Sequence, residues 1–314
     1  MKATINWIDY LKNERIYLYG LDFILIKLIN SIKQKEEEKF SRLSLAKSIK
    51  VCPRSLYYWL EGKRPIPLNI FLKLINLSNY QLNDILNDIE MNLKGIAMGW
   101  GNSNKLVKLP FLLTHELAYF VGYLFGDGCL KSKEYNVHLV DEYSEQINNI
   151  QLHIFSLFGI KGKIVRKQNK TEIMIYSKAL WIFLNKIFGM PIGKKYKIKI
   201  PDIINFSDFR LSFVKGFIDA DGGIFRIEEY KYLPKWIVKS PNIEVSSKYK
   251  IILQQIKDIL EDYDLMGRLY FHRTNQSYRL FLNGKINLLK CNKIGIFKHP
   301  VKAMRLNQLC SKLY

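Results

Sequence analysis

The chain has 314 residues, of which 48% are hydrophobic and 25% are charged. This composition excludes a disordered protein and leaves room for two ordinary domains, or for one domain plus a duplicated one. A net charge of +21 points to an acidic partner, and a nucleic acid fits better than a membrane surface because the basic residues alternate with apolar ones in short segments.

None of the cysteines belongs to a CxxC pair, so neither a zinc knuckle nor a disulfide framework is expected. The longest apolar run, residues 23–32, is interrupted by Lys27 and Asn30 and is too short to span a bilayer. The first residues lack the order of a signal peptide. We therefore expect no membrane partner and a cytoplasmic location.

Residues 1–95 are predicted to form an all-helical domain. Within it, about residues 42–77, the stretch SLAKSIKVCPRSLYYWLEGKRPIP resembles the helix-turn-helix of phage-repressor-like domains. Helices are expected over 44–49 and 53–61, and Pro53 suits the first position of the second helix. The resemblance implies groove contacts and phosphate contacts with DNA from five residues: Arg54, Ser55, Tyr58, Lys63 and Arg64. A plain helical bundle remains the alternative.

Residues 96–110 are expected to be a linker because the stretch around them contains three glycines, two asparagines and no helical period. Beyond it the pattern repeats. Each copy predicts a helix, a hairpin, a helix, a second hairpin and a closing helix, over residues 111–205 and 206–314. The fold class is thus α/β (α+β), with two pseudo-symmetric αββαββα halves behind the all-α domain.

Each copy opens on a similar helix, which reads FVGYLFGDG over 120–128 and VKGFIDADG over 214–222. Both match the LAGLIDADG pattern, and the chain from about Leu112 onward resembles the two-motif, single-chain homing endonucleases of that family. Gly122 and Gly216 lie mid-helix, where glycine costs about 1 kcal/mol relative to alanine but lets another helix approach closely. We expect these glycines to form the interface between the two helices.

Each motif ends in Asp-Gly, and the glycine is expected to let the chain leave the helix in a left-handed conformation. Asp127 and Asp221 at the helix ends would create an anionic spot suited to Mg²⁺ or Mn²⁺, which bind few carboxylates together with water and phosphate oxygens. The resemblance implies that these two aspartates are the metal ligands and catalytic residues of a phosphodiester hydrolase. The alternative is that they only end helices.

The first motif departs from the pattern at Phe125, which replaces an acidic residue, whereas the second keeps Asp219. Lys215 replaces a small residue in the second motif. The family also carries a basic residue late in each repeat. Lys194 is the first choice in the first copy and Lys195 the second, while Lys298 or Lys302 are the candidates in the second copy.

The hairpins alternate charged and apolar residues, so one set of side chains should face the core and the other DNA. The candidate DNA-binding residues of this surface are Lys163, Arg166, Arg268, His272, Arg273 and Arg279. The five histidines are scattered and form no nuclease cluster. The alternative for the hairpins is a solvated sheet face.

These observations favour a monomeric, site-specific endonuclease that cuts double-stranded DNA at a long, asymmetric site. Two alternatives remain open: a non-catalytic DNA-binding regulator on the same scaffold, and a maturase that binds intron RNA. A protein-splicing element is not expected, since the chain starts with Met and ends in CSKLY.

Overall fold

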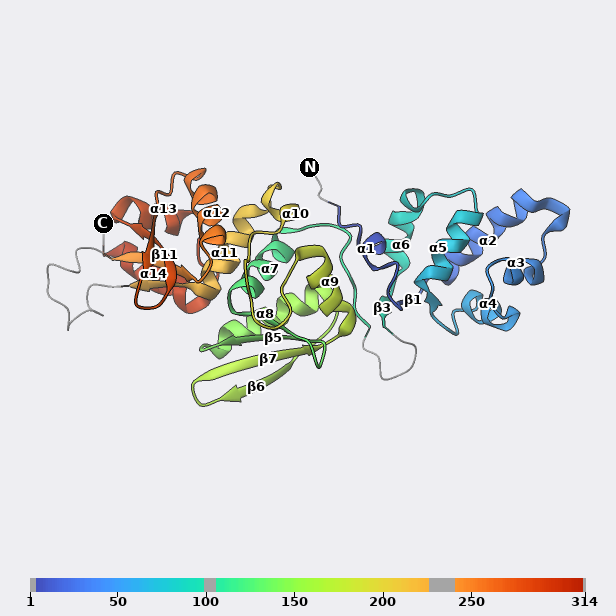
Figure 1. The fold of residues 1–314 in the computed structure, drawn as a ribbon, viewed down its shortest axis with the longest axis horizontal. Helices are drawn as coiled ribbons and strands as arrows, with labels where there is room; N and C mark the ends of the chain where they lie inside the picture. The colour runs from blue at the N-terminus through green and yellow to red at the C-terminus, as the bar shows by residue number, and fades with distance from the viewer. Residues whose placement is uncertain (1–3, 99–105, 226–240, 313–314) are drawn as a thin grey trace.

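The structure is a computed structural model that describes residues 4–98, 106–225 and 241–312. In these ranges the chain forms helices and three antiparallel sheets. Figure 1 shows an elongated molecule: the N-terminal helices occupy one end, α11 to α14 occupy the other, and α7, α8 and α9 lie between them above the strands β5 to β7. The mixed helix and sheet class expected from the sequence is confirmed for the two halves.

The N-terminal part consists mainly of short helices around one apolar core. Its α-helices are α1 (Trp7–Leu11), α2 (Asp22–Glu36), α3 (Arg42–Ser48), α4 (Pro53–Leu60), α5 (Leu68–Leu77) and α6 (Leu86–Asn92), with 3-10 turns at Glu37–Lys39 and Leu82–Ile85. The predicted turn between α3 and α4 is present, and Lys50 in it has a positive φ of 59°. Leu45, Ile49 and Leu56 are buried beneath these helices, as expected for core positions.

The prediction that this part is all-helical is wrong. A three-stranded sheet of order β2-β1-β3 joins β1 (Tyr17–Tyr19), β2 (Ile66–Pro67) and β3 (Gly95–Ala97). The strands are two or three residues long, so they carry no alternating pattern to read. They exist because distant segments pair, with Leu18 opposite both Ile66 and Ile96.

The first residues of the linker expected over 96–110 belong to this sheet and are not a loop. The segment from residue 96 onward begins inside β3, and Ile96 forms a bridge with Val107. Residues 99–105 of the expected linker lie outside the described residues. The N-terminal part also touches the first half directly, because the N–H of Ile5 donates to the carbonyl of Phe111 at 2.7 Å.

The two halves repeat one order of elements. The first half contains α7 (His115–Asp127), β4 (Cys129–Lys131), β5 (Asn136–Asp141), α8 (Ser144–Phe158), β6 (Lys163–Lys167), β7 (Lys170–Tyr176) and α9 (Lys178–Phe188). The second contains α11 (Arg210–Asp221), β8 (Gly222–Phe225), β9 (Asn242–Ser247), α12 (Lys250–Glu261), β10 (Arg268–His272), β11 (Ser277–Asn283), α13 (Lys285–Lys293) and α14 (Pro300–Ser311). The short α10 (Asp202–Asn205) precedes the second half.

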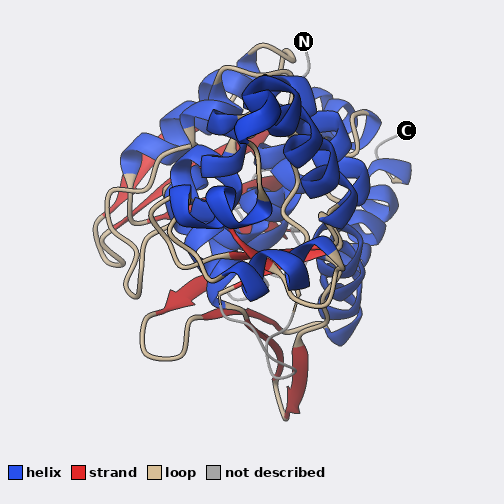
Figure 2. Cartoon of the chain, turned by 90° about the vertical axis from the view of Figure 1, so that its right-hand side faces the viewer, coloured by secondary structure: helices blue, strands red, loops and turns tan. Residues whose placement is uncertain are grey.

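The strand orders are equivalent as well. The first sheet has the order β4-β5-β7-β6 and the second β8-β9-β11-β10. Within the described ranges, the helices pack against one face of each sheet and leave the other face open. Figure 2 shows strands that project below the helices. The predicted strand after the second motif ends at Phe225, and its remaining residues lie outside the described ranges. The domain boundaries remain predictions.

The core is continuous across the halves because α7 and α11 pack against each other more extensively than any other two elements of the described chain. Both helices are apolar on most sides, as helices surrounded by protein are. Within the described ranges, no helix is both long enough and apolar enough to cross a membrane.

Candidate nuclease site at the paired helix ends

The two motif helices touch at their glycines. A Cβ atom built on Gly122 would lie 2.0 Å from the carbonyl oxygen of Phe213, and one on Gly216 would lie 2.0 Å from that of Tyr119. Real Cβ contacts are never this short, so neither position admits a side chain without separating the helices. The approach continues to the helix ends, where a Cβ on Gly126 would meet Ala220 Cβ at 2.3 Å and Asp221 Cγ at 3.5 Å.

The glycines after the aspartates have a different role from the expected one. Gly128 (φ −86°, ψ 161°) and Gly222 (φ −97°, ψ 155°) leave their helices in an extended conformation, so the expected left-handed exit is wrong. Glycine is needed there for space. A Cβ on either residue would lie 2.5 Å from a carbonyl oxygen of the last helical turn, that of Leu124 or Ile218.

The helix contact brings Asp127 and Asp221 together. Asp127 keeps an exposed surface and Asp221 is half-buried, but protein atoms surround both carboxyl groups. Burial and, after it, the nearby charge of Asp127 raise the pKa of Asp221 to about 7, against the opposing effect of two lysines. Burial also raises the pKa of Asp127, although Lys302 and Lys195 counteract this. The two carboxylates therefore lie so close together that ionising both of them is energetically unfavourable.

Each helix end is closed by one lysine. Lys195 Nζ donates to the carbonyl of Phe125 at 2.8 Å and also to that of Gly126. In the second half, Lys302 Nζ donates to the carbonyls of Asp219 at 2.5 Å and Ala220 at 3.2 Å. These lysines neutralise the negative end of each helix dipole. Burial lowers the pKa of both ammonium groups, while the surrounding aspartates raise it.

Lys194, the first choice from the sequence, is exposed and is not the residue that closes the helix end. The two lysines adjoin, and the sequence holds no signal that distinguishes them, since the segment between α9 and α10 has no regular period. In the second copy Lys302, one of the two candidates, is the residue that contacts the helix end. Lys298 instead lies over the ring of Tyr119, with Nζ 5.0 Å from the ring centroid.

The site is asymmetric at the first acidic position of the motifs. Asp219 is completely buried, and its Oδ2 accepts hydrogen bonds from Tyr119 Oη at 2.7 Å and from two backbone N–H groups, those of Lys298 and His299, at 2.9 Å each. Burial raises the pKa of Asp219, and these hydrogen bonds oppose that rise. Phe125 takes the equivalent place in the first half and packs on Phe213, with ring centroids 5.5 Å apart.

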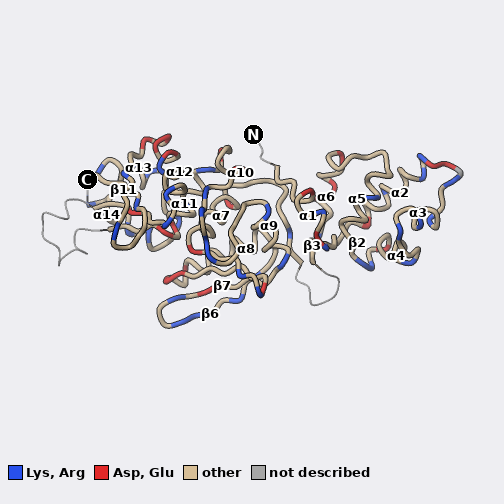
Figure 3. The backbone as a smooth tube through the Cα atoms, in the orientation of Figure 1, with Lys and Arg blue, Asp and Glu red and all other residues tan. Residues whose placement is uncertain are grey.

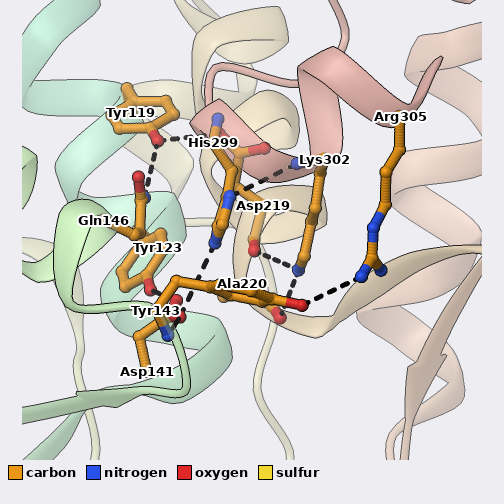
Figure 4. A network of polar contacts seen from close by, with 10 residues as sticks. All are labelled: Tyr119, Tyr123, Asp141, Tyr143, Gln146, Asp219, Ala220, His299, Lys302 and Arg305. Carbon is orange, nitrogen blue, oxygen red and sulfur yellow. Dashed lines mark hydrogen bonds and ion pairs between the residues drawn. The ribbon is translucent and has the colours of Figure 1, made fainter. Parts of the chain in front are cut away.

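A polar network that the sequence did not reveal joins the halves beside the aspartates (Figure 4). His299 is completely buried, and its Nε2 lies 3.6 Å from Asp141 Oδ1. Asp141 also accepts hydrogen bonds from Tyr123 Oη and from the backbone N–H of Tyr143. Burial would raise the pKa of Asp141, but the close approach of His299 and the hydrogen bonds from Tyr123 and Tyr143 outweigh it, so the pKa lies below its usual value.

Helix α14 carries the second half of this network. His299 caps its N-terminus, because the backbone N–H of Lys302 donates to His299 Nδ1 at 3.4 Å. One turn further, Arg305 donates to Tyr143 Oη at 3.1 Å. Reciprocally, Tyr249 Oη of the second half donates to the carbonyl of Lys195. A tyrosine of each half thus contacts the lysine-bearing segment of the other half.

Asp127 lines a cleft of about 770 Å³ between the sheets, and the neighbours of Asp221 in the chain, Ala220 and Gly222, line it as well. On the side of the first half the cleft is lined by polar residues, and on the side of the second half it is lined by the start of β8 and by α14. The lining includes Asp127, Asp141, Glu142, Tyr143, Asn169, Lys170, Gly222, Gly223, Lys302 and Arg305. Lys215 lies away from this cleft, since its Nζ donates to the carbonyl of Ile294 at 2.5 Å and so closes the end of α13. Its departure from the motif leaves the helix contact intact.

The expected DNA surface is the open face of the two sheets. Pairing places Arg268, His272 and Arg279 on that face of the second sheet, because their strand neighbours Leu269 and Leu280 point to the core. Arg273 follows in the exposed hairpin turn. Lys163 lies on the open face of the first sheet, and Figure 3 shows basic residues along the β6–β7 hairpin.

Arg166 does not share the face of Lys163. Three positions separate the two residues along β6, and side chains alternate with a period of two. Arg166 pairs with the buried Thr171, so it is directed to the helix-covered side at the exposed end of the strand. Its expected place on the open face is therefore wrong.

The N-terminal candidates gather around one ring. Arg54 Nε donates to Tyr58 Oη at 2.8 Å, and the guanidinium of Arg64 lies 4.5 Å from the ring centroid of Tyr58. Arg54 and Arg64 are exposed, Ser55 is half-buried in the same helix, and Lys63 pairs with Glu61 at 2.7 Å. This cluster lies at the end of the molecule remote from the paired motif helices (Figure 1).

Comparison with known proteins places the second half in a family. Residues 208–295 match the model of a LAGLIDADG-like domain. The chain is 25% identical over 318 aligned positions to elongation factor 2 of Methanopyrus kandleri, with 97% of this chain and 22% of the relative covered. It is 28% identical over 197 aligned positions to a tRNA-splicing ligase of Pyrococcus furiosus, with 55% of this chain and 20% of the relative covered.

The chain thus spans about a fifth of the length of these curated relatives. Their names describe unrelated activities. Among solved structures, mesophilic variants of the homing endonuclease I-DmoI are 17% identical, with 62% of this chain and 97% of that chain covered and a TM-score of 0.44. The LAGLIDADG meganuclease I-AabMI is 11% identical, with 64% and 92% covered and a TM-score of 0.43.

The fold and site define a duplicated α+β protein with two acidic helix ends held at one point by glycine contacts. The second half matches the model of a LAGLIDADG-like domain, and the first half repeats the same elements around the same kind of helix.

Proposed function

We propose that the protein is a site-specific endonuclease that hydrolyses double-stranded DNA with a divalent metal at Asp127 and Asp221, and that it acts as a monomer. The observation that carries this proposal is the side-by-side arrangement of the two aspartates at the end of the helix contact, each beside one lysine. The two aspartates form an acidic site that can bind a cation, and the net charge of +21 favours binding of a polyanion to the rest of the surface.

The residues present fit a magnesium-like ion. The donors would be two neighbouring carboxylates, of which Asp127 lines an open cleft, and such an ion completes its coordination with water and substrate phosphate. No cluster of three or more metal-binding side chains occurs in the described part of the chain, which argues against a site enclosed by protein ligands. A bound divalent ion supplies charge neutralisation at the phosphate and an acidified water.

The chain's own residues organise this place. Lys195 and Lys302 engage the last carbonyls of the helices, so the negative ends of the helix dipoles do not add to the charge of the aspartates. Asp219 holds the backbone N–H groups of Lys298 and His299, which fixes the segment leading to Lys302. On the open sheet faces, Lys163, Arg268 and Arg279 are placed to contact phosphates or guanine edges.

The first test is selection from a randomised library of duplex DNA by the purified full chain, with magnesium and separately with EDTA. Both cut and bound fragments are sequenced. Magnesium-dependent cutting at one long site is the expected result. Salt-sensitive binding without cutting in either condition would favour a regulator, and preferential binding of structured RNA would favour a maturase.

Asp127→Asn and Asp221→Asn test the site itself. Each removes one carboxylate charge while keeping side-chain size, so we expect cleavage to fall by at least about 10³-fold while affinity for the selected duplex changes less than about threefold. If either variant retains most of the cleavage rate, the proposed metal site is wrong even if the protein is a nuclease.

A further inference from the structure

The open face of the second sheet carries an aromatic pair. Tyr270 of β10 and Phe281 of β11 have ring centroids 5.9 Å apart at an interplanar angle of 64°. The register places both on the open side, since Tyr270 lies opposite Arg279 and Phe281 opposite Arg268. Tyr270 is 51% exposed, so its ring is available to a partner on this face.

Cationic and polar side chains surround this aromatic pair. Arg268 and His272 flank Tyr270 on the same strand face, and Arg279 faces it across the strand. Glu244 holds Arg279 with an Nη1–Oε1 distance of 2.9 Å. His272 Nδ1 accepts the backbone N–H of Asn275 at 3.3 Å, which leaves its Nε2 as the donor. The surface is therefore an apolar patch within a basic face, directed away from the core.

The first sheet differs at the same register. There Val165 and Met174 take the places of Tyr270 and Phe281, as the pairings of β6 with β7 show. Both are half-buried, and Glu172 beside them pairs with Lys167 at 2.6 Å and Lys170 at 3.0 Å. An equivalent apolar place thus exists in both halves. In the second half it is occupied by the exposed ring of Tyr270, whereas in the first half it is occupied by the aliphatic Val165, and the exposed ring of that face, Tyr176, lies at the end of β7.

We propose that Tyr270, supported by Phe281, is a specificity-determining residue that contacts the 5-methyl group of thymine in the major groove beneath the second sheet. This inference rests on the proposed function. Thymine is the only base with a methyl group on the major-groove edge, and an apolar side chain is its complement. The flanking cations contact phosphates and guanine edges, so the aromatic pair is what discriminates thymine there.

The test uses the full chain in EDTA and the duplex selected above. Each thymine of the half-site under the second sheet is replaced singly by uracil, which lacks only the methyl group. Burying one methyl group contributes about 0.8 kcal/mol, so we expect the affinity to fall about fourfold at one or two positions. Tyr270→Ser should abolish this difference between thymine and uracil, whereas Tyr270→Phe, which keeps the ring, should retain it.

Val165→Ser is the matched control, because it changes the equivalent position of the other hairpin and should leave the uracil effect in this half-site intact. The proposal is overturned if the half-site contains no thymine, if uracil is tolerated at all of its positions, or if Tyr270→Ser still distinguishes the two bases. Those results leave the endonuclease assignment standing. Failure to select any duplex contradicts the proposed function instead.

Discussion

The pKa values of the paired aspartates couple stability to pH. In the folded protein the pKa of Asp221 is about 7, against 3.8 for an unperturbed carboxyl, so the folded state favours the protonated form. This contribution to stability is complete below about pH 4 and is lost as the pH rises through 7. Without metal, the ionised pair therefore destabilises the helix contact at alkaline pH.

Asp221→Asn should reverse this effect. In metal-free protein we expect the variant to melt at least about 3 °C higher than the wild type at pH 8, and to differ little from it at pH 5, where Asp221 is protonated. Thermal unfolding followed by circular dichroism at both pH values measures this. Asp258→Asn, on the exposed side of α12, is the control and should shift both values alike. An equal effect of Asp221→Asn at both pH values would contradict the raised pKa.

Lys195 and Lys302, which contact the ends of the motif helices, should each contribute to the rate of cleavage. Lys302→Met and Lys195→Met each remove the ammonium that engages the carbonyls at a helix end and partly neutralises the aspartates. We expect cleavage to slow by on the order of 10²-fold in each variant. Lys194→Met changes an exposed neighbour and should leave the rate within about twofold of the wild type. Single-turnover cleavage of the selected duplex distinguishes the two groups, and equal effects in all three would return Lys194 to the site.

The contact between helices α7 and α11 depends on Gly122 and Gly216, because any side chain at either position would collide with the other helix. Gly122→Ala or Gly216→Ala introduces a Cβ 2.0 Å from a backbone oxygen of the other helix, so the helices must separate. We expect a loss of about 3 kcal/mol or more in the free energy of unfolding, measured with urea. At Gly223 a Cβ would meet nothing closer than 3.4 Å, so Gly223→Ala is the control and should cost less than about 1 kcal/mol. A similar loss in all three would mean that the contact is not the cause.

Most elements of the two halves could be predicted from the sequence because their patterns are local. The predicted order of helix, hairpin, helix, hairpin and helix is present in the first half, where α9 over Lys178–Phe188 closes the unit. The small N-terminal sheet was missed since its strands exist only through long-range pairing. His299 and Asp141 were missed for the same reason: they are 158 positions apart in the sequence, and only the packing of α14 on the first half brings them together.

The motif aspartates could be predicted because the pattern itself repeats, whereas the choice between Lys194 and Lys195 depended on the direction of an irregular segment. The exit conformation of Gly128 and Gly222 was mispredicted because two different needs, a positive φ and close backbone contact, select the same residue. A sequence shows that a glycine is present, but not whether it is there for a positive φ or for close backbone contact.

At the scale of the whole molecule, the charge of +21 should appear as a steep dependence of DNA binding on salt. Lys163→Gln removes one cation from the open face of the first sheet, so the slope of log K against log salt should become less negative by about 0.9. Lys186 lies on α9, which packs against the helix-covered side of β5, and Lys186→Gln should leave the slope unchanged. Affinity titrations between about 50 and 200 mM salt measure this, and matching slopes for both variants would contradict the assignment of the open face.

The contact between α7 and α11 constrains how the sequences of the two halves can diverge. The glycines and aspartates at the helix contact occur in both copies, because an alteration on one side is felt at once by the other. Within the described residues, the outer hairpins do not contact each other in this way, and their equivalent positions carry different residues, Val165 in the first half and Tyr270 in the second. With both copies on one polypeptide, either recognition surface is free to acquire a new preference alone, so a target that began as a mirror-symmetric sequence need not remain one.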